Sequence, residues 1–160
     1  MIRVTFEESK SIPEGLGFYQ ADTGLLAVYV RSPMNYCGSI STEGATYIDL
    51  TAENELVSMD ISASREFWRI SPDVGLPKIA KKGRVFFCTT GQVDDDEEIL
   101  TNRDQNSVCL SFSKKDCGFV QVASDIFFGI LEDGVLAQIL IARIIEDPGC
   151  EESNAWLGLM

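Results

Sequence analysis

The sequence contains no histidine. Histidine is the commonest general base at neutral pH and the commonest zinc ligand, so its absence excludes Ser–His and Cys–His nucleophile activation and the usual zinc sites. The sequence also has no glycine-rich phosphate loop and no nucleophile elbow. We therefore expect a protein without a cofactor that is not an enzyme, although carboxylate, lysine or tyrosine chemistry would still be open to it.

Basic residues are scarce, with 13 Lys and Arg against 25 Asp and Glu and a formal net charge of −12 at pH 7. Such a surface repels the phosphates of nucleic acids and anionic membranes, so neither is expected as a partner. A basic protein is the complementary partner, although the same charge also simply keeps a protein soluble. The candidate partner-facing residues form one run of acids, Asp94, Asp95, Asp96, Glu97 and Glu98.

Long apolar runs are missing as well. The longest, Val135 to Ile145, is interrupted by Gln138 and Arg143, and it is shorter than the about 20 residues that a membrane helix needs. We expect the first residues, which alternate in polarity, to form a strand and not a cleavable signal. No two of the cysteines have the two-residue spacing of a zinc or redox pair. We expect a cytoplasmic protein in which Cys37 and Cys117 are reduced and buried.

Alternation of apolar and polar residues dominates what is present. Residues 47–61 read as two strands around an acidic turn at Asn54, with one apolar and one polar face. Residues 62–68 begin like a short helix, because Ser62 or Ser64 could cap it. This pattern predicts a mainly β fold of antiparallel sheets and hairpins with one or two short helices; an α+β fold is the alternative.

A related stretch recurs 80 positions later, which is half of the 160-residue chain. Cys117 falls on Cys37, Val108 falls on Val28, and the turn at Gly134 falls on the first turn. We interpret this as a tandem duplication, with residues 1–80 and 81–160 as two β-rich halves packed as one compact, pseudo-twofold domain. The alternative is that any two hairpins in a β-rich protein would share this pattern.

Three segments also resemble a known family, namely Asp22–Val30, Tyr47–Leu50 and Glu55–Ser64. Their acidic lead-in, short aromatic strand and final alanine–serine are similar to the small bacterial DUF2283 domain of unknown function. Ser58 and Asp60 depart from the glycine and the glutamate of that family. The resemblance covers about a quarter of the chain; it implies a small β-sheet followed by a short helix, and it implies no catalytic residue.

The two copies differ on one face of their last strand. Asp60 in the first copy corresponds to Leu140 in the second, so the second strand is predicted to be covered on both sides. A homodimer partner or the C-terminal tail would supply the cover. The candidate interface residues are Leu136, Leu140, Trp156 and Leu157.

The leading functional hypothesis is a non-enzymatic binding or interaction protein, for example an acidic inhibitor or immunity-type protein for a basic partner. One alternative is a small-molecule-binding β-fold with a site between the halves, lined by Tyr29 and Trp68. The other is a histidine-free hydrolase that uses the carboxylates of Asp49, Asp60 and Glu66.

Overall fold

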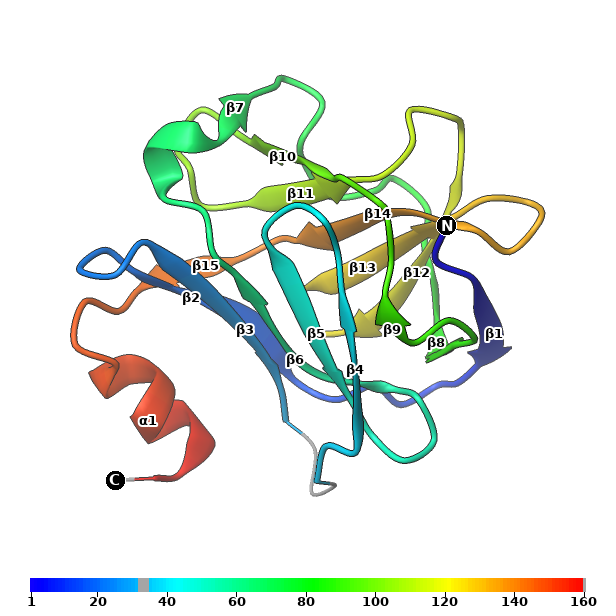
Figure 1. Ribbon diagram of the computed structural model, residues 1–160, viewed down its shortest axis with the longest axis horizontal. Helices are drawn as coiled ribbons and strands as arrows, with labels where there is room; N and C mark the ends of the chain where they lie inside the picture. Colours follow the sequence, from blue (N-terminus) through cyan, green and yellow to red (C-terminus); the bar gives the residue numbers. More distant parts are fainter. Residues whose placement is uncertain (32–34, 160) are drawn as a thin grey trace.

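The computed structural model describes residues 1–31 and 35–159, and it is mainly β with one short helix (Figure 1). The first sheet has the strand order β15 (Ile144–Glu146), β2 (Gly15–Gln20), β3 (Leu25–Val30), β6 (Leu56–Ile61), β5 (Thr46–Leu50), β4 (Gly38–Ser41) and β9 (Gly91–Gln92). The second sheet has the order β1 (Val4–Glu8), β8 (Lys81–Phe87), β12 (Gly118–Ala123), β13 (Ile126–Ile130), β14 (Leu136–Ile141), β11 (Val108–Ser111), β10 (Glu98–Thr101) and β7 (Arg69–Ile70). A 3₁₀ turn, η1 (Arg65–Phe67), replaces the helix expected near residue 62, and α1 (Glu151–Leu157) lies near the C-terminus. The predicted mainly β fold class is confirmed, although each sheet is mixed and contains two parallel pairings besides its antiparallel ones.

The core lies between the two sheets and is built from the inward-facing residues of both. The alternating pattern predicts this for Met59 and Ile61, which are fully buried. A bulge in the β5–β6 ladder next to Leu50 then changes the parity, so Leu56 faces the core instead of Val57. The same bulge in the β13–β14 ladder turns Leu136 into the core, and Leu136 is therefore not an outer-face residue.

The sequence repeat is visible in the strand pairing. The order β2-β3-β6-β5-β4 returns as β10-β11-β14-β13-β12, so β6 and β14 have corresponding neighbours. Both hairpin turns use a left-handed residue at the expected position, Asn54 with φ 66° and Gly134 with φ 85°. The offset of 80 positions does not hold for every strand. Val108 pairs with Ile141, but the residue that pairs with Ile61 is Leu26 and not Val28, so β3 is shifted by two residues relative to β11.

Each half contributes two short strands to the sheet that is built mainly from the other half, β1 and β7 to the second sheet and β9 and β15 to the first; we call β7 and β15 the exchanged strands. β7, from the first half, extends the second sheet by pairing in parallel with β10, and β15, from the second half, extends the first sheet by pairing in parallel with β2. Neither sheet is therefore built from one half alone. The segment that follows each exchanged strand then runs over the outer face of the sheet that the strand has joined.

Candidate functional site

The outer face of the second sheet is covered by the chain itself. Leu140 is only 3% exposed and packs with Cys109 and Phe127. The partly buried Val74 and Ala80, from the segment that follows β7, pack against this cluster. Leu140 is covered, as predicted, but residues 71–80 supply the cover instead of the C-terminal tail or a second subunit.

The tail lies on the other sheet. Helix α1 packs beside β2 and β3 (Figure 1). There the Trp156 ring centroid is 5.8 Å from that of Phe18, and the Arg31 guanidinium is 4.3 Å from the Trp156 centroid. Asp147 fixes the start of the helix, because its carboxylate accepts hydrogen bonds from the backbone N–H groups of residues 152 and 153 at 2.9 and 3.2 Å. Trp156 and the exposed Leu157 are therefore not brought together with Leu136 and Leu140.

An apolar groove opens where the covering segment ends. β8 pairs with β12 through only two residue pairs, Lys81 with Val120 and Lys82 with Gln121, and then turns to pair with β1. The groove left beside this short ladder has a volume of about 420 Å³. Its walls include Phe6, Ile79, Lys81, Cys117, Phe119 and Ile130, and we call it the Phe119 groove.

Glycines and one exposed side chain shape this groove. The Phe6 ring lies over Gly83, where any Cβ atom would collide with the ring. Gly118 has no heavy atom within 4 Å of its Cβ position, so it leaves open space at the groove. Ile79 is 86% exposed at the wall, which leaves a large apolar side chain unburied in the free protein.

The thiol in the groove is not activated. Burial, and then the charge of Asp116, raises the pKa of Cys117, so the neutral thiol is favoured over the nucleophilic thiolate. Its Sγ fills the space above Gly129, which corresponds to Asp49 in the first half. All five cysteines are free. The prediction that Cys37 is buried is wrong, because this residue is exposed. Cys117 is only half-buried, so the prediction holds in part for it.

The acidic run does not form one outward-facing patch. Glu97 is buried, and its Oε1 accepts hydrogen bonds from Thr42 Oγ1 at 3.0 Å, the Ala45 N–H at 3.0 Å and Thr46 Oγ1 at 2.5 Å. This carboxylate therefore ties the segment before β10 to the β4–β5 turn. Asp95 and Glu98 are partly buried, with the Met1 amino group 3.0 Å from Asp95 and Arg69 2.9 Å from Glu98. Asp94 and Asp96 are the exposed acids of the run.

The carboxylates of the hydrolase hypothesis are only partly brought together. Asp49 and Asp60 share the outer face of the first sheet, where Ser58 Oγ donates a hydrogen bond to Asp49 at 3.0 Å. Burial, and then the charge of Asp49, raises the pKa of Asp60. Glu66 lies elsewhere, exposed on η1 beside a surface depression that Tyr19 and Arg65 also line.

The two predicted ligand-lining aromatics have different positions. Tyr29 lies next to Ser58 on the outer face of the first sheet, and burial, followed by the charge of Asp60, raises its pKa. Trp68 is buried in the core, where its Nε1 donates to the Ala63 carbonyl at 2.9 Å. Neither lines the Phe119 groove. Sequence reasoning missed this groove because Ile79 stands in a proline- and glycine-containing segment that reads only as a junction.

No protein-family model matches the chain, and no curated protein sequence matches it. The resemblance to the DUF2283 domain stays a prediction. Within residues 1–31 and 35–159, no cluster of three or more Cys, Asp or Glu residues is placed to hold a metal ion. No helix in the same part of the chain is long and apolar enough to cross a membrane.

Proposed function

We propose that this chain is a non-catalytic binding protein whose Phe119 groove receives the apolar part of a small ligand. The observation that carries the proposal is an open groove whose lining includes the exposed Ile79 side chain and the half-buried Phe119. A volume of about 420 Å³ falls within the range of roughly 300–1,000 Å³ that is usual for ligand sites. Covering such side chains stabilises a complex by about 25 cal/mol for each Å² of apolar surface removed from water.

The chemistry of the groove supports binding over catalysis. Its two ionisable side chains among the described residues are Lys81 and Cys117. The Lys81 amine is well exposed and lies 3.7 Å from Glu8, which is an ordinary surface ion pair. Burial raises the pKa of the Cys117 thiol, so the nucleophilic thiolate is disfavoured.

Titration with a neutral apolar fluorophore, N-phenylnaphthylamine, tests the proposal. Ile79→Asp should weaken binding of the fluorophore at least about tenfold, because burying such a side chain is worth roughly 1.5–3 kcal/mol. Leu76→Asp is the matched control, since Leu76 is exposed in the same segment but does not line the groove. Equal affinity of the wild type and both variants would overturn the proposal.

We also propose partners and a compartment on narrower grounds. The exposed Asp94 and Asp96 would steer a basic protein toward the chain, and such binding should weaken as salt is raised. Phe67, which is 75% exposed, is the side chain on which a homodimer would form; sedimentation of Phe67→Asp against the wild type tests this. Five free thiols, with Cys37 and Cys88 exposed, favour a reducing compartment and hence the cytoplasm.

A further inference from the structure

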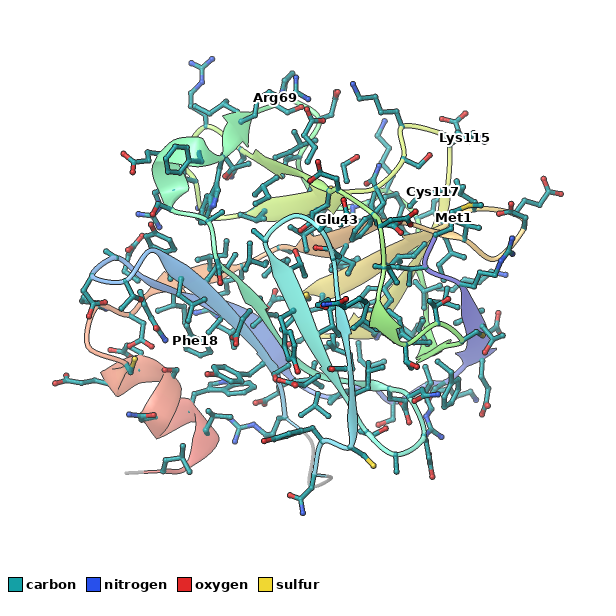
Figure 2. All side chains as sticks on the ribbon, in the orientation of Figure 1. Met1, Phe18, Glu43, Arg69, Lys115 and Cys117 are labelled. Atoms are coloured by element: carbon teal, nitrogen blue, oxygen red, sulfur yellow. The ribbon has the colours of Figure 1, made fainter. Side chains whose placement is uncertain are left out.

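The lysines of this acidic chain gather around the Phe119 groove. Lys81 lines the groove itself, and it shares an adjoining surface depression with Lys10 and Lys82. Lys78 directly precedes the groove residue Ile79. The last two, Lys114 and Lys115, lie in the loop that leads into Cys117 (Figure 2). All six lysines in the sequence are thus in segments that border one apolar groove.

Four of the seven arginines are used differently. Arg31, Arg65, Arg69 and Arg84 each form an ion pair with a glutamate of the same chain. Among the lysines, and within the described residues, only Lys81 has a carboxylate within ion-pair distance, Glu8. In a chain with a net charge of −12, these mostly unpaired ammonium groups are cationic partners that an anion would meet at this groove.

We infer that the ligand of the Phe119 groove is a monomeric amphiphilic anion, with its apolar chain in the groove and a carboxylate or similar acidic head at the lysines. This inference rests on the proposed function. Lys81 connects the two parts, because it borders both the groove and the lysine-lined depression. The acids in the same segments are Glu7, Glu8, Asp116, Glu132 and Asp133, which are five carboxylates against six lysines.

The type of side chain fits such a head group. A lysine ammonium is a compact, well-hydrated point charge on a flexible stem, and it attracts an anion without imposing the planar, bidentate geometry of an arginine. Lys82 is exposed beside the β8–β12 ladder and lines the depression that adjoins the groove at Lys81, so a head group lying in that depression meets its amine. The groove then binds the apolar part of the ligand, and the lysines favour an anionic head group.

The test compares decanoate with decanol, which share an alkyl chain of the same length, below the micellar concentration of decanoate. Displacement of the bound neutral fluorophore gives both affinities at low salt. Decanoate should bind about tenfold more tightly than decanol, and about 0.5 M salt should remove most of that advantage because it screens the lysine charges.

Two charge-reversal variants test whether the lysines beside the groove cause the preference for decanoate. Lys82→Glu should lower decanoate affinity by about threefold to fivefold, in line with an exposed ion pair, and should leave decanol affinity unchanged. Arg103→Glu makes the same change in net charge at an exposed position in the β10–β11 turn, and it should leave both affinities unchanged. Circular dichroism of the two variants shows whether the fold is retained.

The outcomes separate the inference from the proposed function. Equal binding of decanol and decanoate would overturn the inference and leave apolar ligand binding in place. Failure of the neutral fluorophore, decanol and decanoate alike to bind would overturn both. Binding to phosphatidylglycerol vesicles, and not to phosphatidylcholine vesicles or monomeric decanoate, would assign the lysines to a membrane surface and so overturn the inference.

Discussion

Asp60 and Leu140 occupy the same place in two related ladders, Asp60 opposite Tyr47 on β5 and Leu140 opposite Phe127 on β13. The first position belongs to a half-buried polar face, and the second is buried beneath residues 71–80. A single repeat position therefore has two environments, because a different segment of the chain covers each sheet.

This difference predicts that reciprocal substitutions at the two positions change stability by very different amounts. Leu140→Asp should lower the free energy of unfolding by more than about 3 kcal/mol, because it removes core contacts and buries an unpaired charge. Asp60→Leu should leave the fold intact and change stability by less than about 1 kcal/mol, since the position is only half-buried. Urea unfolding of both variants measures this. A stably folded Leu140→Asp protein would contradict the assignment of its cover.

The raised pKa of Asp60 predicts that replacing this residue by a neutral one stabilises the protein, by an amount that depends on pH. Because folding raises this pKa, the favourable contribution of Asp60 is fully present below the unfolded value and is lost as the pH rises through the folded pKa. Asp60→Asn should therefore raise the free energy of unfolding at pH 7, by less than about 1 kcal/mol at this partly exposed site.

The gain should shrink as the pH falls toward the ordinary carboxyl pKa of about 4, where Asp60 is neutral in both states. Urea unfolding at several pH values follows this, with Asp96→Asn as the exposed control. A gain of equal size at acid and neutral pH would show that charge is not its cause.

The buried carboxylate of Glu97 predicts a structural role for one member of the acidic run. Glu97→Ala should cost about 2–4 kcal/mol of stability, because it leaves the Thr42 and Thr46 hydroxyls and the Ala45 N–H without their acceptor. Asp96→Ala, one position away and exposed, should change stability by less than about 0.5 kcal/mol. Similar thermal melts for the two variants would refute this role.

The helix α1 should protect the first sheet only. Trp156→Ala removes the contacts with Phe18 and Arg31 and should cost roughly 1–2 kcal/mol. Amide hydrogen exchange should then accelerate in β2 and β3 and stay unchanged in β14. Leu157→Ala, at a more exposed position of the same helix, is the matched control. Faster exchange in β14 would contradict this prediction and indicate that the tail covers the second sheet.

The sequence by itself determined the fold class, the hairpins and the repeat. Period-two alternation assigns side chains to the faces of a strand. It correctly predicts that Met59, Ile61, Ile139 and Ile141 are buried. The left-handed turns at Asn54 and Gly134 follow from residue type, because asparagine and glycine tolerate a positive φ. These are local preferences, and neighbouring residues are enough to express them.

Only the tertiary structure decided what covers each face and where a groove stays open. The exchange of β7 and β15 carries residues 71–80 over Leu140 and α1 over Phe18, and no local pattern records a contact between segments so far apart. Glu97 turns inward because distant residues of the β4–β5 turn supply its donors. The Phe119 groove exists because β8 leaves β12 after two residue pairs, so its position depends on how the strands are arranged in space.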